Sequence, residues 1–286
     1  GLEVFEQFRH FDRPNASNVA RARLIDDLVR EELAGDPERL VVTVGAGFDT
    51  RPYRLGAGRW VELDEPAVMA LKDERLPVEE CPRPLTRVAI DFETESLAEK
   101  LAPIASGERA VVIVEGVLMY LTDAQRRDTL SALVAALPGH VLFCDLMTKR
   151  FLDRYAGPIH DVLAGMGAVF RDLSDEPGRV LLGVGYEHAG SWSTVEASKR
   201  YGLVRIPWLV LWTVLRPRVR DYRVKRCEAP CARRPRRPPA RRAARQIRWP
   251  ALPPAPRPRA RPPVRPHRRS APDSSSRPPR CGRTPR

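Results

Sequence analysis

The chain of 286 residues carries 49 basic and 36 acidic side chains, a formal charge of +13, but the basic excess lies in one segment. Residues 230–286 hold 18 arginines, 16 of the 29 prolines and one acid, so residues 1–229 carry 31 basic and 35 acidic side chains. This distribution excludes a basic nucleic-acid-binding face on the folded part as a first interpretation. It also excludes one continuous domain over the whole length.

We predict a domain over residues 1–228 and a disordered arginine- and proline-rich tail over 229–286. Such a tail cannot bury enough apolar surface to offset roughly 1–2 kcal/mol of backbone entropy per residue. It could bind nucleic acid or another anionic surface through counterion release. A shifted reading frame after about Cys227 in a GC-rich gene would give the same composition, and we favour that interpretation, which sequencing of the coding DNA would test.

The five cysteines, at 81, 144, 227, 231 and 281, form neither a disulfide framework nor a zinc-binding spacing, so we expect no metal site. Cys144 lies in an apolar run, where a cysteine packs as a small hydrophobic residue. The longest apolar run, 206–215, is shorter than the roughly 20 residues that span a bilayer. The chain shows no signal peptide, so we expect a cytoplasmic protein without a membrane partner. It begins with Gly1 rather than Met, which leaves open whether further residues precede it.

Short apolar runs alternate with segments of helical spacing along most of the chain. After a helix over 19–33, the pattern predicts strands at 40–44, 60–64, 86–91, 110–114 and 140–145, with helices at about 66–73, 96–104 and 123–137, the last capped by Asp123. Beyond 145 it predicts helices at 151–168 and 193–202 and strands at 204–214 and 222–226. The alternation indicates an α/β fold with right-handed crossovers and a mostly parallel sheet covered on both faces.

In open parallel sheets, ligands bind beyond the carboxyl ends of the strands. Glycines and acids follow four consecutive predicted strands, and we expect them at one edge of the sheet: Gly45, Gly47, Asp64, Asp91, Phe92 and Glu115. Each residue also has a plain structural interpretation. The glycines could serve a turn alone, Asp64 could cap a helix, Glu115 could be a solvated loop acid, and Tyr120 could pack under the sheet.

The spacing of these residues favours one class of ligand. A side chain at Gly45 or Gly47 would block close approach of a ligand to the backbone. Asp64 follows Gly45 by 19 residues, the usual distance at which an acid accepts both ribose hydroxyls of an adenosine. Thr50 stands where a dinucleotide motif needs its third glycine, which disfavours a nicotinamide cofactor.

Four segments carry the recognisable motifs of the chain: RARLIDD at 21–27, GAGFDTRPYRL at 45–55, ELDEP at 62–66 and EGVLMYLT at 115–122. Together they resemble the leucine carboxyl methyltransferase family, and more closely its bacterial branch of O-methyltransferases linked to polyketide and other secondary metabolism. The resemblance covers about residues 7–228, and 221–224 resembles the family's closing strand.

The resemblance implies a class I, Rossmann-like methyltransferase fold that binds S-adenosyl-L-methionine. It gives Arg21, with Arg23 as the fallback, the methionine carboxylate, and it gives Glu115 the amino group. It places Gly45 and Gly47 beside the methionine portion, Asp64 on the ribose hydroxyls, and Asp91 and Phe92 beside the adenine. Tyr120 and Arg21 are the candidates for orienting the methyl acceptor.

The implied activity is O-methylation of a small-molecule secondary metabolite. A carboxylate acceptor is already ionised, so alignment and exclusion of water would suffice for the in-line displacement. A hydroxyl acceptor would need a base, and the candidates are His10, His140, His160 and His188, although we expect each to be structural. The alternatives are methylation of a protein C-terminal carboxylate or a modified tRNA, or a nucleic-acid-associated protein that acts through the basic tail.

Overall fold

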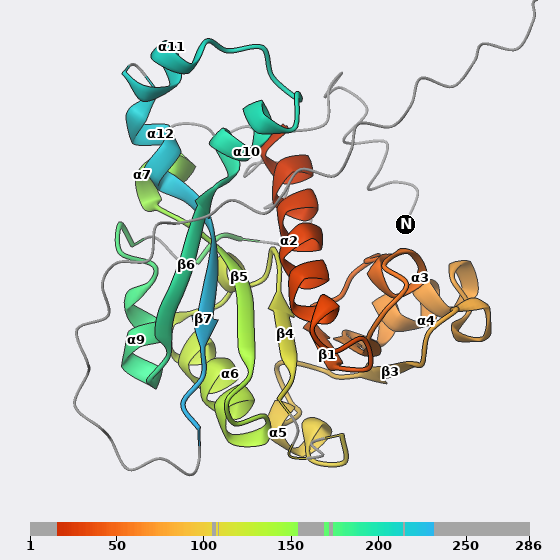
Figure 1. Cartoon of the computed structure of the whole chain (residues 1–286). Helices are drawn as coiled ribbons and strands as arrows, with labels where there is room; N and C mark the ends of the chain where they lie inside the picture. Colours follow the sequence, from red (N-terminus) through yellow and green to blue (C-terminus); the bar gives the residue numbers. More distant parts are fainter. Residues whose placement is uncertain are drawn as a thin grey trace, which may run out of the picture. The chain divides into compact units, whose positions relative to one another are not determined.

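The computed structural model describes residues 16–104, 107, 109–153, 169–171, 174–213 and 215–231. The predicted α/β fold is confirmed, because seven strands form one sheet in the order β3-β2-β1-β4-β5-β7-β6 (Figure 1). The strands are β1 Leu40–Val44, β2 Arg59–Asp64, β3 Leu85–Ala89, β4 Val111–Val114, β5 Val141–Met147, β6 Glu187–Ser193 and β7 Tyr222–Glu228.

The strands β3, β2, β1, β4 and β5 are parallel, and β1 and β4 are buried along their whole length. Both strands are runs of valine, isoleucine, leucine and threonine, which is typical of strands with helices on both faces. The chain proceeds from β1 to β2 and β3 on one side and then to β4 on the other. The strand order therefore reverses between β1 and β4, at the place where open α/β sheets bind ligands.

Helices pack on both faces of the sheet (Figure 1). Leu24 and Ile25 of α2 and Ala197 of α10 share one buried cluster with Val111 and Phe143. Apolar residues of α5, α6 and α9 share the other cluster with the opposite face. The helices and turns are α2 Ala16–Ala34, α3 Arg51–Arg54, α4 Pro66–Arg75, η1 Val78–Glu80, α5 Leu97–Leu101, η2 Leu118–Tyr120, α6 Asp123–Ala136, α7 Lys149–Phe151, α9 Arg179–Val184, α10 Thr194–Arg200, α11 Trp208–Trp212 and α12 Arg216–Asp221.

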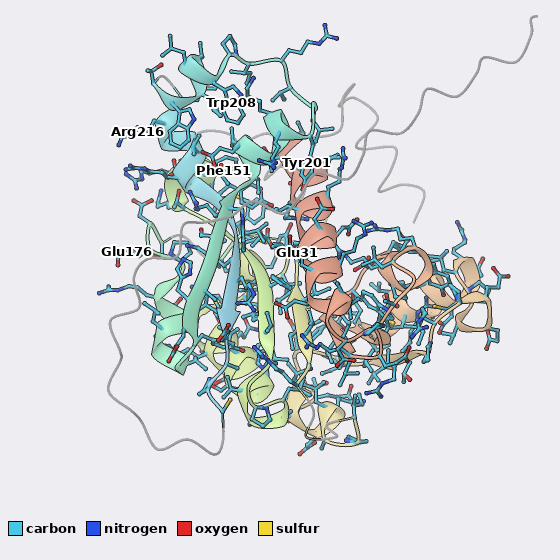
Figure 2. All side chains as sticks on the ribbon, in the orientation of Figure 1. Glu31, Phe151, Glu176, Tyr201, Trp208 and Arg216 are labelled. Carbon is cyan, nitrogen blue, oxygen red and sulfur yellow. The ribbon has the colours of Figure 1, made fainter. Side chains whose placement is uncertain are left out.

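The strand predicted at 204–214 is wrong. Pro207 precedes a short helix there, α11, whose Leu211 is buried while Trp208 lies on the exposed side (Figure 2). The missing strand is β6, whose sequence EHAGSWS contains no β-branched residue and carries an irregularity between His188 and Gly190. Pairing with β7 therefore holds it as a strand against its weak intrinsic preference.

Two predicted boundaries also differ from the structure. Thr122, not Asp123, caps α6, because the Thr122 side chain and Gln125 satisfy each other's backbone N–H groups in a capping box. The third strand ends at Ala89, so Asp91 lies in the following turn. The helix predicted at 151–168 lies outside the described residues except for 151–153.

The final strand, β7, runs antiparallel between β5 and β6. Its pairing continues beyond residue 228, because Ala229 N–H donates to His140 O at 2.9 Å and Gly139 N–H donates to Pro230 O at 3.1 Å. The predicted domain boundary at 228 stays a prediction. Within the described ranges no helix has both the length and the apolar character to cross a bilayer.

Candidate functional site

A glycine turn follows β1. Gly45 and Gly47 have φ angles of +68° and +46°, which favour glycine. A Cβ on Gly45 would lie 2.4 Å from Val117 Cγ2, so the turn passes directly against the loop after β4. The turn is held to β2, because Gly45 N–H donates to Leu63 O at 2.9 Å.

Asp64, the last residue of β2, braces this turn. Its Oδ2 accepts a hydrogen bond from Gly47 N–H at 2.5 Å, and its Oδ1 accepts one from Glu65 N–H at 2.7 Å. The Asp64 side chain is nearly buried. Asp64 therefore fixes the position of the glycine backbone in the structure described here.

Arg21 of α2 reaches across the ends of β4, β5 and β7. Its Nε donates to Glu115 Oε1 at 2.8 Å, and its Nη1 donates to Asp145 Oδ2 at 3.0 Å and to Tyr222 Oη at 2.6 Å. Asp145 Oδ1 in turn accepts from Gly116 N–H at 2.7 Å. One arginine thus joins residues from four elements, and we call Arg21, Glu115, Asp145 and Tyr222 the arginine cluster.

Arg51 also binds the Glu115 carboxylate, through the oxygen that Arg21 does not contact. Its guanidinium is 3% exposed and donates to Asp26 Oδ1 at 2.8 Å, Asp49 Oδ2 at 2.6 Å and Glu115 Oε2 at 2.7 Å. These bonds tie segment 45–55 to segment 21–27 and to Glu115. The contacts give a physical reason why the motif segments occur together in one chain.

Glu115 and Tyr222 of the arginine cluster keep one protonation state each at neutral pH. Burial alone would raise the pKa of Glu115, but Arg51 and Arg21 outweigh it and hold that pKa below its usual range. Burial raises the pKa of the Tyr222 phenol, which therefore stays neutral and donates to Asp145 Oδ2 at 3.0 Å. Glu115 is accordingly a carboxylate and can accept a hydrogen bond from a cationic group.

One end of the Arg21 guanidinium remains open. No atom in the described ranges accepts a hydrogen bond from Nη2, although Nε and Nη1 are both engaged. Gly116 lies beside it with φ at +69°, and a Cβ there would sit 3.3 Å from Nη2. The structure thus leaves Nη2 free to donate to an anion.

Arg21, Gly45, Gly47 and Glu115 line a cavity of about 340 Å³. An open guanidinium nitrogen, an ionised carboxylate and a bare glycine backbone therefore face one small space. This donor and acceptor set fits the zwitterion of an amino acid, because a carboxylate pairs with an arginine and an ammonium group pairs with a carboxylate.

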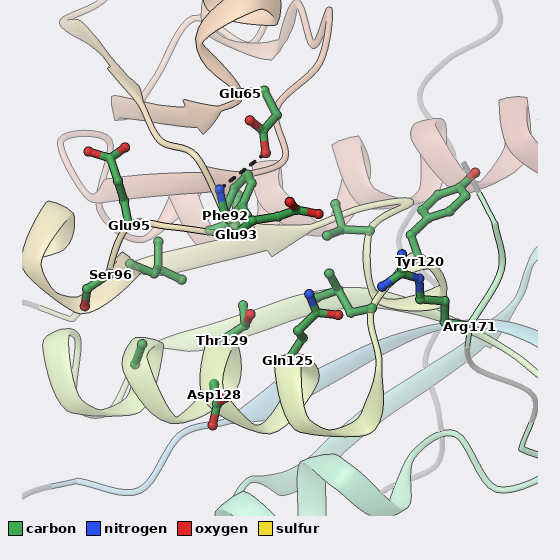
Figure 3. Close-up of a pocket in the computed structure, with 15 residues that line it drawn as sticks. Glu65, Phe92, Glu93, Glu95, Ser96, Tyr120, Gln125, Asp128, Thr129 and Arg171 are labelled. Atoms are coloured by element: carbon green, nitrogen blue, oxygen red, sulfur yellow. Dashed lines mark hydrogen bonds between the residues drawn. The ribbon is translucent and has the colours of Figure 1, made fainter. Parts of the chain in front are cut away.

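A larger cavity of about 510 Å³ lies beyond Val44 and Val117 (Figure 3). Phe92 and Tyr120 line it, and the Tyr120 ring stacks on Phe170 with 5.1 Å between centroids. Its charged lining residues are four acids and one cation: Glu65, Glu93, Glu95, Asp128 and Arg171. The contact between Gly45 and Val117 lies where the two cavities adjoin.

The structure brings together four of the predicted site residues in the smaller cavity, Arg21, Gly45, Gly47 and Glu115, and two in the larger one, Phe92 and Tyr120. Asp64 lines neither cavity and acts through Gly47. Asp91 also lines neither, because its Oδ1 accepts from Glu93 N–H at 2.8 Å and from Thr94 N–H at 3.2 Å. Roles for these residues in binding stay predictions.

The fallback arginine and the described histidines lie away from both cavities. Arg23 is exposed and stacks over the Tyr201 ring at 4.4 Å. His140 precedes β5, and His188 pairs with Cys227 at the same edge, which is the amino end of the parallel strands. His10 and His160 lie outside the described residues.

Five charged or polar residues that the site uses were not predicted: Arg51, Glu65, Asp145, Arg171 and Tyr222. A signal existed for Asp145, which is the single charged residue in the apolar run 141–147. Arg51 and Glu65 stand inside the quoted motifs, where a buried arginine next to acids suggests an ion-pair network. Tyr222 stands in the segment that resembles the family's closing strand, but nothing signalled its contact with Arg21, which depends on the antiparallel direction of β7.

Comparison with known proteins agrees with this geometry. The sequence matches the model described as leucine carboxyl methyltransferase over residues 4–134. A Streptomyces coelicolor protein, provisionally named an S-adenosyl-L-methionine-dependent methyltransferase, is 30% identical over 201 residues, which cover 65% of this chain and 67% of that protein. The chain belongs to the leucine carboxyl methyltransferase family.

Two further similarities extend this result. The tetracenomycin polyketide synthesis O-methyltransferase TcmP of Streptomyces glaucescens is 28% identical over 156 residues, which cover 52% of this chain and 54% of TcmP. The chain thus matches about half the length of that member of the family. A crystal structure of a DUF574 family protein from Streptomyces avermitilis shares the fold, with a TM-score of 0.52 at 14% identity over 74% of this chain and 83% of that one.

The predicted class I methyltransferase fold is confirmed by the strand order, the family and this structural likeness. The predicted cofactor, S-adenosyl-L-methionine, is the one in the Streptomyces coelicolor relative's name, and the prediction is confirmed at the level of the family.

Proposed function

We propose that this chain is an S-adenosyl-L-methionine-dependent O-methyltransferase that methylates a carboxylate, or a hydroxyl, of a small-molecule secondary metabolite. The observation that carries the proposal is the open Nη2 of Arg21 beside ionised Glu115 in the smaller cavity. Arg21 would hold the methionine carboxylate and Glu115 the amino group. The bound cofactor supplies an electrophilic methyl group on a sulfonium.

The larger cavity suits the adenosyl portion at one end and the acceptor at the other. Glu65 and Phe92 lie together, because Phe92 N–H donates to Glu65 Oε1 at 3.3 Å (Figure 3). An acid and an aromatic ring suit ribose hydroxyls and an adenine. We assign the ribose to Asp64, as the family resemblance implies, or to its neighbour Glu65, which faces the cavity.

The cation of the larger cavity supports an anionic acceptor. Arg171 stands near Tyr120, and its N–H donates to Met119 O at 2.8 Å (Figure 3). The other charged lining residues are acids, so an anionic acceptor would be drawn to the Arg171 end. Arg171 would hold the acceptor carboxylate there.

Tyr120 is suited to donate a hydrogen bond to the acceptor. Burial raises the pKa of its phenol, so the group stays protonated at neutral pH. No histidine in the described ranges lines either cavity. An acceptor that is already ionised needs no base, so the carboxylate is favoured over the hydroxyl. Tyr120 and Arg171 would orient the acceptor, and the cavity would exclude water. These two effects would accelerate the methyl transfer.

The cofactor assignment is tested by calorimetry with S-adenosylhomocysteine and with 5′-methylthioadenosine, which lacks the amino acid end. We expect S-adenosylhomocysteine to bind the wild-type protein at least about tenfold more tightly than methylthioadenosine, the scale of one charge-assisted contact. Arg21→Lys should reduce this ratio. Equal binding of both ligands by the wild-type protein would contradict the roles of Arg21 and Glu115.

A second pair of variants separates the two candidate ribose acids. Asp64→Asn and Glu65→Gln should each be titrated with S-adenosylhomocysteine, with Glu79→Gln of the exposed turn η1 as the matched control. The variant that loses about tenfold in affinity marks the ribose ligand. If neither loses affinity relative to the control, the adenosyl portion does not bind in the larger cavity.

The alternative methyltransferase functions differ in the molecule that accepts the methyl group. A screen of aromatic carboxylic acids and phenols, a peptide with a free C-terminus and a tRNA pool, each with methyl-labelled cofactor, identifies which one takes up label. A salt-dependent shift of DNA or RNA that is lost on removing 232–286 would instead support the nucleic-acid interpretation.

A further inference from the structure

A further cavity of about 480 Å³ lies on the face of the sheet that α9 covers. Leu146 of β5, Arg223 and Lys225 of β7 and Leu182 of α9 contribute to its wall. In the β5–β7 register, Arg223 pairs with Leu146 and Lys225 pairs with Cys144. Because side chains alternate along a strand, this face is opposite to the one on which the arginine cluster lies.

Two cations of this wall, Arg223 and Lys225, form no ion pair within the described residues. Arg223 donates to Ser191 Oγ at 2.6 Å, to Ser191 O at 3.0 Å and to Val219 O at 3.2 Å, all of which are neutral oxygens. Lys225 has no hydrogen bond or ion pair in the described part of the chain. Arg223 and Lys225 therefore have no acid in direct contact among the described residues, and Glu196 acts on Arg223 only through its charge.

The acids that line the cavity do not neutralise the charges of Arg223 and Lys225. Glu176, at the outer edge of the molecule, pairs with Arg179 at 3.0 Å (Figure 2), and Asp175 pairs with Arg150 at 3.4 Å. Asp221 is the remaining lining acid, against the three cations Arg220, Arg223 and Lys225. The lining thus keeps a net positive charge after its ion pairs are set aside.

The neighbouring titratable groups respond to this field. Burial, and then the charge of Arg223, lower the pKa of Lys225. Burial, and then Lys225 and Arg223, lower the pKa of His188 on the adjacent strand. The charge of Arg223 thus disfavours protonation of both Lys225 and His188, and a bound anion would relieve that repulsion.

We propose that this cavity binds an anionic head group carried on a short apolar chain, an alkyl carboxylate or an alkyl phosphate. Lys225 and Arg223 meet the oxygens of the head group, and Leu146 and Leu182 contact the chain. Leu182 is 64% exposed, so the site leaves a place for an apolar chain at its mouth. The proposal does not depend on methyl transfer, because neither Arg223 nor Lys225 belongs to the arginine cluster.

The test uses the full chain and three six-carbon probes. Sodium hexanoate, monohexyl phosphate and neutral hexan-1-ol are titrated by calorimetry at pH 7. We expect at least one anionic probe to bind at least tenfold more tightly than hexan-1-ol, and the stronger of the two identifies the head group. Equal binding of all three probes would overturn the proposal.

Lys225→Met removes the charge and keeps the chain length, and Lys149→Met is the matched control. Lys149 is a lysine at the start of α7 that pairs with Asp153. The first variant should lose about tenfold in affinity for the anionic probe, and the control should bind as the wild-type protein does. Equal affinity in both variants would place the anion elsewhere.

A labelling measurement on the wild-type protein covers the case in which Lys225→Met does not fold. Lysines are acetylated at pH 8 with a water-soluble active ester, with and without the anionic probe, and mapped by mass spectrometry. We expect the probe to slow acetylation of Lys225 at least fivefold and to leave Lys149 unchanged. Unchanged labelling of Lys225 at a saturating probe concentration would overturn the proposal.

Discussion

Arg21 and Asp145, 124 positions apart in the chain, form an ion pair in which Nη1 lies 3.0 Å from Oδ2. The Asp145 side chain is fully buried, and its other oxygen holds the Gly116 backbone. The pair therefore links α2 to β5 and to the loop after β4, at the open edge of the sheet. It also holds the guanidinium beside Gly116, where a Cβ would lie 3.3 Å from Nη2.

We expect Asp145→Asn to destabilise the fold. The amide keeps the shape of the side chain but leaves Arg21 with Glu115 as its single acidic partner. Removing one member of a buried pair costs about 3 kcal/mol, and urea unfolding measures the loss. Asp153→Asn, which breaks an exposed pair with Lys149, should cost about 0.5 kcal/mol or less. Similar losses in the two variants would contradict a structural role for the Arg21–Asp145 pair.

Gly45→Ala should be more harmful than Gly47→Ala. Both residues have positive φ angles, which cost an alanine about 1–2 kcal/mol, but a Cβ on Gly45 would also collide with Val117, whereas one on Gly47 meets no atom within 4 Å. Thermal unfolding of both variants measures the difference. Adding Val117→Ala to Gly45→Ala should recover part of the loss. No coupling between positions 45 and 117 would show that the turn moves away from the β4 loop.

His140 should make stability depend on pH. Burial lowers the pKa of His140 from its ordinary value of 6.5 to about 4, and its Nδ1 donates to Leu137 O at 2.7 Å, so that Nε2 accepts from Tyr186. The unfolded chain binds this proton more tightly than the folded one. His140 therefore stabilises the fold above pH 6.5, and this contribution of about 3 kcal/mol is lost as the pH falls to 4.

The His140→Gln variant provides the measurement. It removes the titration, so its free energy of unfolding relative to the wild-type protein should improve by about 3 kcal/mol between pH 7.5 and pH 4. His188→Gln, at an exposed position of β6, is the comparison. A difference that stays constant with pH would mean that His140 is not held neutral in the folded protein.

Lys72→Met should leave the buried carboxylate of Glu62 with one cationic partner fewer. Glu62 and Lys72 are fully buried and lie 2.8 Å apart, and Arg87 reaches Glu62 from the other side at 3.0 Å. Removing Lys72 should cost about 3 kcal/mol at neutral pH. The double variant Lys72→Met/Glu62→Gln should recover part of this loss, because Arg87 keeps its ion pair with Asp73.

The stability of the Lys72→Met variant should depend on pH, in a direction that follows from the pKa of Glu62. Burial already raises the pKa of Glu62 in the wild-type protein, and loss of Lys72 should raise it further. The folded state then binds the proton more tightly than the unfolded state. Stability of the variant should therefore be greatest below the ordinary pKa of glutamate and fall as the pH rises. Urea unfolding at pH 4 and pH 7 distinguishes this from a loss that is the same at both values.

Removal of 232–286 should leave the stability of the domain unchanged, and removal of 229–286 should lower it. The difference is the pairing of Ala229 and Pro230 with His140 and Gly139, which the shorter chain lacks. Thermal unfolding of both truncated chains measures this. Equal melting temperatures would show that the pairing beyond residue 228 adds nothing.

Much of this fold is readable from the sequence because its signals are local. Runs such as 40–44 and 110–114 are long enough and apolar enough to identify buried parallel strands, and parallel strands bring their carboxyl ends to one edge. That is why Gly45, Gly47 and Glu115 could be assigned to a common edge before their contacts were known. The bracing of Gly47 by Asp64 follows from the same adjacency of β1 and β2.

The features that could not be predicted depend on contacts between residues far apart in the sequence. β6 has no strand-forming sequence, and α11 is apolar enough to resemble a strand, so neither could be assigned from propensity. Tyr222 joins Arg21 across 201 positions because β7 is antiparallel, which no local pattern encodes. The buried Asp145 was visible as a charge in an apolar strand, but its partner was not.

The place of β7 in the sheet constrains the order in which the chain can fold. β6 is made before β7 but forms no ladder with any other described strand, since β7 lies between it and β5. During synthesis, β6 must therefore wait without a partner until the last strand leaves the ribosome. Docking of β7 then joins β6 to the sheet and delivers the Tyr222 hydroxyl to Arg21 in the same step, so the arginine cluster is complete only once β7 is in place.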